Sequence, residues 1–438
     1  MSEPAQDAET VHPSFGEAAR FWLKLGFISF GGPAGQIAIM HEELVERRRW
    51  VDDARFQHAL NFCVLLPGPE AQQLATYLGW LFHGWRGGVL AGTLFFLPAA
   101  VLLWLLSWLY VTHGQIAWVA AIFYGLKPAV VALVATAMLR LGKKSLNTPL
   151  RWAIAAGALA LVALAKAPFP LVVVGAGLVG WLTTKFRPST PPPAATISLT
   201  APPTPLPSPI SHLLTPISHL LTPILWLTIW WLPLLALGTV LGWDHAVSRE
   251  GLFFSQASMV TFGGAYAVLP YVQAQAVGHF DWLTSAQFLD GLALGETTPG
   301  PLVIVLQWVG FLGGWHQPGR LSPLTAATLG AAATTWATFA PSFLWIFTGA
   351  PFIERLRHRS DLTAMLGAVT AAVVGVITTL AVQLALNVAR PAGGAWDWFA
   401  CGLTIVAFLA MMVAKLRPIP CILLCGLVGA GWQLFVVR

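Results

Sequence analysis

The chain is poor in charged residues. Only 10% of its 438 residues are Asp, Glu, Lys or Arg, whereas 56% are hydrophobic. A soluble globular domain carries roughly 25% charged residues, so this composition excludes an ordinary soluble protein. Many apolar runs reach the length of about 20 residues that crosses the hydrocarbon core of a bilayer. The sequence therefore predicts an all-α polytopic membrane protein, with the lipid bilayer as its surroundings.

Cysteine is also scarce. The four cysteines, Cys63, Cys401, Cys421 and Cys425, all lie in apolar runs, and the chain has neither a CxxC motif nor a Cys/His metal spacing. A dinucleotide fingerprint and a haem-attachment motif are absent as well. We therefore expect no metal and no cofactor, and we do not expect an enzyme. The net charge of +6 indicates basic cytoplasmic loops rather than a nucleic-acid partner.

Two short motifs occur twice at one spacing. Phe30-Gly31-Gly32 recurs 232 residues later as Phe262-Gly263-Gly264, and Pro67-Gly68-Pro69 recurs as Pro299-Gly300-Pro301. Between 30–69 and 262–301, 11 of 40 positions are identical without a gap. Each copy thus has two Gly/Pro breaks in apolar sequence. At membrane depth such breaks are tolerated only where the backbone is buried in protein or lines a cavity.

The rest of the chain is organised around these two copies. We predict five segments: a polar tail at 1–14, a first repeat unit at 15–185, a proline-rich linker at 186–224, a connecting transmembrane helix at 225–244, and a second repeat unit at 245–438. The linker includes a tandem SHLLTPI repeat at 211–224, interpreted as a local duplication. Asp52 and Thr284, at equivalent positions, are expected to cap helices.

The distribution of Lys and Arg predicts the orientation. If all four broken segments are re-entrant, most Lys and Arg fall on one side, the cytoplasm, and the chain has about nine full spans. If they all cross, the chain has up to about thirteen spans. Both alternatives give an odd number of crossings between the copies, so the two halves are expected to be inverted. Inverted halves with broken or re-entrant helices are typical of secondary transporters.

The breaks are candidate binding elements. Glycine allows backbone N–H groups to approach a ligand, and helices that open at Pro69 and Pro301 would direct their N-termini at an anion. The alternative is that the glycines permit close helix packing and the prolines only bend the helices. The candidate substrate-binding residues of the breaks are Gly31, Gly32, Pro67, Gly68, Pro69, Gly263, Gly264, Pro299, Gly300 and Pro301.

Polar side chains near the breaks are further candidates, because charge inside a membrane is usually functional. Glu70 and Glu296 are candidates for proton coupling, and the repeat does not relate them, so the site is expected to be asymmetric. Gln72 is a candidate hydrogen-bond donor to an oxyanion. Lys24 either reaches the interface or adds positive charge to the site. Lys127 either pairs with an acid or contacts substrate.

These residues resemble a known family. Phe30-Gly31-Gly32-Pro33, the acid- and Arg-rich stretch that ends at Arg49-Trp50, and Leu65–Gln72 resemble the long-chain, two-domain members of the chromate ion transporter family. The resemblance covers about 15–185 and 245–436. It implies export of chromate from the bacterial cytoplasm across the inner membrane, in exchange for protons and with sulfate as a competitor. It also implies chromate resistance.

Three alternatives remain at this stage. In the first alternative, the protein transports sulfate or another tetrahedral oxyanion, in either direction. A chromate reductase would need a redox centre, for which the sequence has no motif. A structural membrane protein would not need repeated breaks within its apolar segments. The sequence leaves open whether the chain acts alone or as a homodimer.

Overall fold

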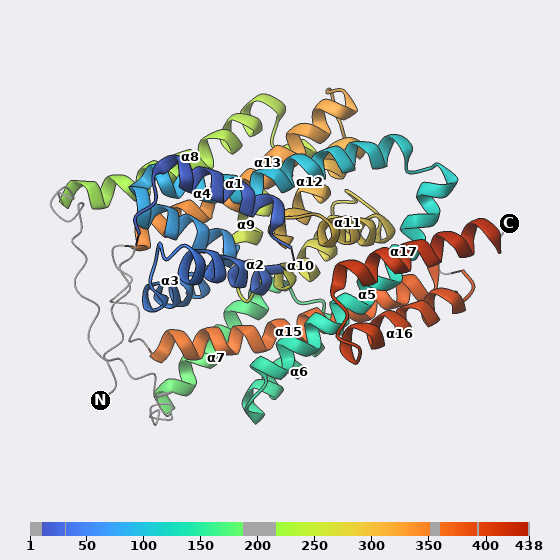
Figure 1. Cartoon of the computed structure of the whole chain (residues 1–438). Helices are drawn as coiled ribbons and strands as arrows, with labels where there is room; N and C mark the ends of the chain where they lie inside the picture. The colour runs from blue at the N-terminus through green and yellow to red at the C-terminus, as the bar shows by residue number, and fades with distance from the viewer. Residues whose placement is uncertain (1–10, 31, 187–215, 351–359, 392–393, 437–438) are drawn as a thin grey trace.

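The computed structural model describes residues 11–30, 32–186, 216–350, 360–391 and 394–436 (Figure 1). Within these ranges the chain is helical and forms no strand. Five helices are long and apolar enough to cross a membrane: Glu70–His113, Ala117–Ser145, Leu221–Leu241, Thr363–Ala389 and Pro418–Phe435. The predicted all-α polytopic membrane architecture is therefore confirmed.

The first copy runs from α1 to α7. Its elements are α1 (Phe15–Ile28), α2 (Gly32–His41), the π-helical turn η1 (Glu42–Arg47), α3 (Asp53–Leu65), α4 (Glu70–His113), α5 (Ala117–Ser145), α6 (Pro149–Ala163) and α7 (Phe169–Phe186). Non-helical backbone at His83 and Gly84 bends α4. We call residues 70–82 its short arm and residues 85–113 its long arm.

The second copy repeats this order after a connecting helix, α8 (Pro216–Leu241). Its elements are α9 (Ala246–Met259), α10 (Ala265–Gly278), α11 (Ser285–Thr297), the 3-10 turn η2 (Leu302–Ile304), α12 (Val305–His316), α13 (Pro323–Gly349), α15 (Ser360–Ala389), α16 (Trp398–Met412) and α17 (Pro418–Phe435). Compared with the first copy, η2 with α12 corresponds to the short arm of α4, and α13 corresponds to the long arm.

The connecting helix begins earlier than the sequence suggested. It starts at Pro216 rather than near 224, so it includes the second SHLLTPI unit. Leucine and isoleucine in that unit favour helix, and proline is tolerated at a helix start. The rest of the predicted linker, residues 187–215, lies outside the described part of the chain.

Side-chain caps begin two equivalent helices where they were predicted. The Asp52 carboxylate accepts a hydrogen bond from the N–H of Arg55 at the start of α3. The Thr284 hydroxyl accepts one from the N–H of Gln287 at the start of α11, within a reciprocal capping box. Both predicted N-caps are confirmed, and they begin the second broken segment at the same position in each copy.

In the first copy, both broken segments are hairpins. The N–H of Val11, before α1, donates to the carbonyl of Arg49, after η1, over 3.0 Å. The ring of Phe15, in the first turn of α1, lies 5.3 Å from the ring of His83, at the end of the short arm of α4. Each segment therefore returns to the end of the molecule from which it started, as the re-entrant alternative requires.

The second copy folds back in the same way. His245, before α9, has its Nε2 atom 3.1 Å from the carbonyl oxygen of Pro318, after α12. His316, at the end of α12, has its Nδ1 atom 2.7 Å from the carbonyl oxygen of Trp282, before α11. The ends of both hairpins thus lie together, and the Gly/Pro breaks are at the opposite, inner ends.

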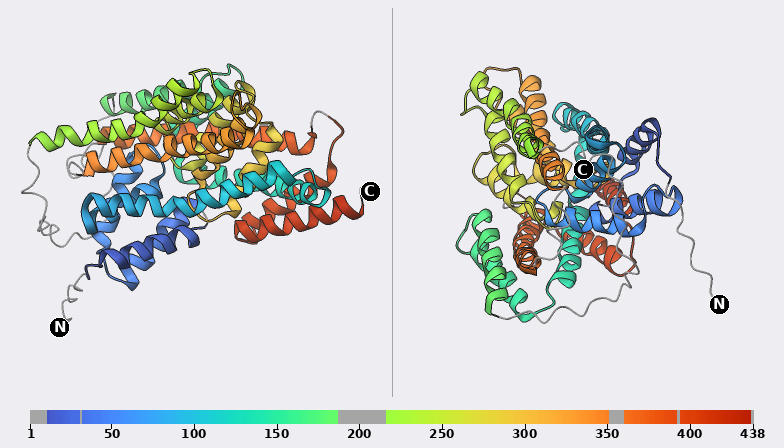
Figure 2. Two further views of the ribbon diagram at one scale, coloured as in Figure 1. Left: turned by 90° about the horizontal axis from the view of Figure 1, so that it is seen from above. Right: turned by 90° about the vertical axis from the view of Figure 1, so that its left-hand side faces the viewer.

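Each half packs a long helix against two helices of the other half. α5 of the first copy packs against α16 and α17 of the second, while α15 of the second packs against α6 and α7 of the first. α4 also packs against its counterpart α13, where the ring of Phe96 stacks on that of Phe339 at 4.3 Å. Each phenylalanine precedes a helix-internal proline, Pro98 or Pro341, by two residues. Figure 2 shows the resulting elongated bundle from two further sides.

Candidate functional site

The four breaks meet inside the molecule. The N–H of Gly68 donates to the carbonyl of Thr261 over 2.8 Å, and the N–H of Gly300 donates to the carbonyl of Ser29 over 2.7 Å. These two bonds are equivalent under the repeat, because Gly300 corresponds to Gly68 and Thr261 to Ser29. Each second hairpin is therefore joined at its break to the first hairpin of the other copy.

Every described break contains glycine in the left-handed region. The φ angles are 71° at Gly32, 119° at Gly68, 82° at Gly263, 96° at Gly264 and 106° at Gly300. Residues with a Cβ adopt this region only at a cost, so the breaks depend on glycine. Gly31 lies outside the described residues.

The glycines have two kinds of surroundings. A Cβ at Gly68 would lie 2.9 Å from Nε2 of Gln73, and a Cβ at Gly300 would collide with Ala99. A Cβ at Gly32 or Gly264, which are equivalent positions, would meet no atom within 4 Å. Gly68 and Gly300 thus permit close packing, whereas Gly32 and Gly264 border open space.

Four helical segments begin at these breaks. α2 begins at Gly32 and α10 follows Gly264, while Pro69 and Pro301 are the N-caps of α4 and η2. The unpaired N–H groups and the aligned peptide dipoles make a helix N-terminus attractive to an anion. The meeting point of the breaks therefore combines several backbone donors with open space beside two glycines.

Buried amide side chains stabilise the breaks. Gln36 of α2 donates from Nε2 to the carbonyl of Gly300 over 2.6 Å, and Gln73 of α4 donates to the carbonyl of Pro67 over 2.7 Å. Gln72, the predicted oxyanion donor, donates to the Thr76 hydroxyl over 3.2 Å, and its role toward an anion stays a prediction. Nothing in the sequence pointed to Gln36, because its partner belongs to the other copy.

The two carboxylates near the breaks have different surroundings. Glu70 is half-buried in the first turn of α4, within electrostatic range of Lys144 at the end of α5. Glu296 is half-buried near the end of α11, where Oε1 accepts a hydrogen bond from the hydroxyl of Tyr266. The charge of Arg140 on α5 acts on Tyr266. The two acids thus lie near different breaks. A basic side chain of α5 acts on Glu70 directly, and another acts on Tyr266, the hydrogen-bond partner of Glu296.

Lys127 has a specific partner. Its Nζ atom lies 3.5 Å from Oδ1 of Asp290 on α11, and the Tyr110 hydroxyl donates to the other oxygen of Asp290 over 2.8 Å. The Asp290 side chain is 4% exposed, so this pair is formed largely out of water. The structure thus supports the pairing alternative for Lys127. Asp290 was not identified in the sequence, since nothing in the chain connects it to a residue 163 positions earlier.

Lys24 lies on the exposed face of α1, where its charge acts on Glu43 of η1. Partial burial raises the pKa of Glu43, but hydrogen bonds from Arg48 and Arg47 and the charge of Lys24 outweigh it, so the pKa is lower than usual. Glu43 is therefore ionised. It neutralises part of the positive charge that Lys24, Arg47 and Arg48 bring to the ends of the first hairpin.

The two pairs of hairpins are covered differently. α10 packs against α15, and α11 packs against α5 and α17. Their first-copy equivalents α2 and α3 form no comparable contact with α5, α15 or α7 in the described ranges. Leu289 and Ala293 of α11 are consequently buried, whereas the equivalent Gln57 and Asn61 of α3 are exposed. Exposed polar side chains at membrane depth are typical of a water-filled cavity, not of a lipid contact.

Comparison with known proteins finds similar sequences over both halves of the chain. The family model described as chromate transporter matches residues 16–181 and 250–430. A chromate transport protein of Pseudomonas aeruginosa is 34% identical, with 95% of this chain and 91% of that protein covered. A chromate transport protein of Cupriavidus metallidurans is 31% identical over 83% of this chain and 81% of its own length. No solved structure matches the chain.

Proposed function

The chain belongs to the chromate transporter family, and on this basis we propose that it exports chromate from the bacterial cytoplasm across the inner membrane. Export is driven by the proton motive force, as an exchange of chromate for protons, and it confers chromate resistance. One observation carries the proposal: two equivalent hydrogen bonds join the breaks in pairs, and α10 packs against η2 between the pairs, beside open space and four helical N-termini.

In this proposal the ligand is a tetrahedral dianion with four acceptor oxygens. The backbone N–H groups at Gly32, Gly263 and Gly264 surround it, and the segments opened by Pro69 and Pro301 contribute their N-terminal dipoles. Gly68, Gly300, Pro67 and Pro299 hold these segments together. Since sulfate has the same shape and charge, backbone donors separate the two ions poorly. Sulfate is therefore the competing ion and the alternative substrate.

We further propose that the two halves are inverted in the membrane. The reciprocal packing of α5 and α15, the Phe96–Phe339 stack and the equivalent hydrogen bonds at the breaks agree with a local twofold relation. Inverted halves can exchange conformations about a fixed central site, which is how many secondary transporters alternate access. The uncovered face of α2 and α3 then corresponds to a state open on the cytoplasmic side.

Cysteine accessibility tests this state. Cysteine at Gln57 or Asn61 is expected to react with a charged, membrane-impermeant thiol reagent applied to the cytoplasmic face. Cysteine at the equivalent Leu289 or Ala293 is expected to be protected, because those positions are buried. The reaction is followed by mass shift in a variant without the four native cysteines. Equal reactivity at equivalent positions would contradict an access pathway on one side.

Neutralising the central carboxylates tests the proton coupling. If Glu296 and Glu70 carry the proton, Glu296→Gln and Glu70→Gln should lose the stimulation of chromate uptake by a proton gradient in inside-out vesicles. Exchange of external for internal chromate should continue, because it needs no net proton movement. Glu42→Gln, at the exposed end of the first hairpin, is the matched control. An unchanged response to the gradient removes that carboxylate from the coupling.

The proposed function itself is tested by chromate uptake into inside-out vesicles. Uptake should require the protein, increase when the vesicle interior is acidified and decrease when sulfate is added. Sulfate uptake without chromate uptake would instead establish the alternative substrate. Uptake by right-side-out vesicles alone would overturn the proposed direction.

A further inference from the structure

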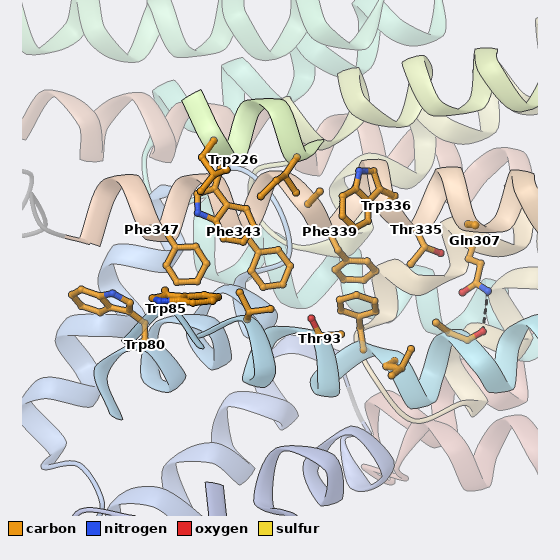
Figure 3. A pocket seen from close by; sticks show the side chains of 18 of the residues that line it. Trp80, Trp85, Thr93, Trp226, Gln307, Thr335, Trp336, Phe339, Phe343 and Phe347 are labelled. Atoms are coloured by element: carbon orange, nitrogen blue, oxygen red, sulfur yellow. Dashed lines mark hydrogen bonds between the residues drawn. The ribbon is translucent and has the colours of Figure 1, made fainter. Parts of the chain in front are cut away.

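A large apolar groove lies between α4, α8 and α13. Its volume is about 1170 Å³. Small-molecule sites usually measure about 300–1,000 Å³, so the groove is large enough for a bulky ligand. Figure 3 shows aromatic side chains of the three helices directed toward one another across it, among them Trp85, Trp226, Phe339, Phe343 and Phe347.

Three N–H groups at the groove are hydrogen-bonded within the protein. Gln307 donates from Nε2 to the carbonyl of Ala100 over 2.9 Å, and the indole N–H of Trp336 donates to the carbonyl of Trp230 over 2.9 Å. The indole N–H of Trp104 donates to the Thr328 hydroxyl over 3.2 Å. The groove therefore offers its occupant an apolar surface, which suits hydrocarbon and does not suit the transported dianion.

The groove opens on the outer face of α4, α8 and α13, of which α4 and α8 are long and apolar enough to cross a membrane. Leu97 and Val101 of α4, Leu225 of α8 and Trp336 of α13 line it and are all exposed. Between Trp85 and Trp104, both in its lining, α4 rises by about 28 Å at 1.5 Å per residue, close to the thickness of the hydrocarbon core. The groove thus runs along the membrane normal, and its opening faces the acyl chains of the bilayer.

One end of the groove carries the chemistry of a headgroup site. The Arg86 guanidinium lies 5.4 Å from the ring of Trp85, and Trp80 lines the same end. Arg86 is exposed and forms no ion pair with an acid in the described part of the chain. Arginine and tryptophan together are typical of the membrane interface, where arginine attracts anionic phospholipid.

We propose that this groove binds one anionic phospholipid, with its acyl chains against the aromatic walls and its phosphate at Arg86. The site is shared by both halves, since α4 belongs to the first copy and α13 to the second, and their Phe96–Phe339 stack lies in its wall. Helix α8, which has no equivalent in the repeat, covers one side. The lipid thus fills the seam where the halves contact each other.

Photocrosslinking tests this site. The full-length protein is reconstituted in nanodiscs with phosphatidylglycerol that carries a diazirine in one acyl chain, and labelled peptides are mapped by mass spectrometry. Labelling should concentrate on the lining of α4, α8 and α13. Ala332→Trp, which fills the groove, should abolish that labelling, whereas Ile405→Trp on the exposed face of α16 should not.

A second variant keeps the test informative if Ala332→Trp does not fold. Arg86→Gln leaves the groove intact and should reduce phosphatidylglycerol labelling about fivefold, the effect of one surface arginine on an anionic lipid. Labelling spread evenly over all exposed helices would overturn the proposal. Disulfide crosslinks between two copies through cysteines placed at this face would also overturn it, because the groove would then be a subunit interface.

Discussion

Valine in place of Gly32 or Gly264 is expected to abolish chromate transport while the protein still inserts and folds. Both glycines have positive φ and border open space at the meeting point of the breaks. A side chain there would occupy the space proposed for the anion and shield the neighbouring N–H groups. The backbone strain, about 1–3 kcal/mol, is too small to unfold a stable protein. Transport is measured as chromate uptake into inside-out vesicles.

The chain offers a matched control for this experiment. Gly242, between α8 and α9, has a φ of 94°, and a Cβ there would also meet no atom within 4 Å. Gly242→Val therefore imposes similar strain away from the breaks and should retain transport. If Gly32→Val and Gly264→Val transported as well as Gly242→Val, the breaks would not form the binding site. Equal loss in all three would indicate a general effect of strain.

Separating Lys127 from Asp290 is expected to destabilise the protein strongly. Asp290→Ala leaves the ammonium group without its partner and removes the acceptor of the Tyr110 hydroxyl. Lys127→Met leaves a buried carboxylate uncompensated. Removing one member of a buried pair typically costs about 3–5 kcal/mol, because the other charge remains out of water. Each single variant should therefore unfold at a lower temperature in detergent than the unmodified protein.

The double variant distinguishes a structural pair from a general packing defect. Lys127→Met with Asp290→Leu removes both charges and should recover most of the lost stability. Asp244→Ala, which removes the exposed partner of Arg249, should change stability little. Additive losses in the double variant would contradict the pairing of Lys127 with Asp290.

Local signals in the sequence predicted much of the architecture. Glycine and proline located the four breaks, and Asp52 and Thr284 located two helix starts, because each feature acts through its own backbone. The repeat predicted that the two copies have equivalent elements. The start of α8 was predicted too late in the chain. A proline-rich stretch can end in a helix when proline occupies the first turn, as Pro216 does.

Contacts between the halves could not be predicted from local signals. Gln36 bonds to Gly300, and Lys127 pairs with Asp290, although long segments separate each pair in the chain. Equivalent positions differ in polarity, with Gln57 and Asn61 in α3 against Leu289 and Ala293 in α11, but this difference does not identify the helices that cover α11 and leave α3 exposed. The covering depends on how α5, α15 and α17 are placed against the hairpins.

The central claim is that the four breaks together bind one tetrahedral dianion. The most direct measurement is an experimental structure of the protein with tungstate, which has the shape and charge of chromate and scatters strongly. The account predicts density beside Gly32 and Gly264, within hydrogen-bond distance of backbone N–H groups at the starts of α2 and α10. Tungstate bound only elsewhere, with the space beside both glycines empty, would contradict it.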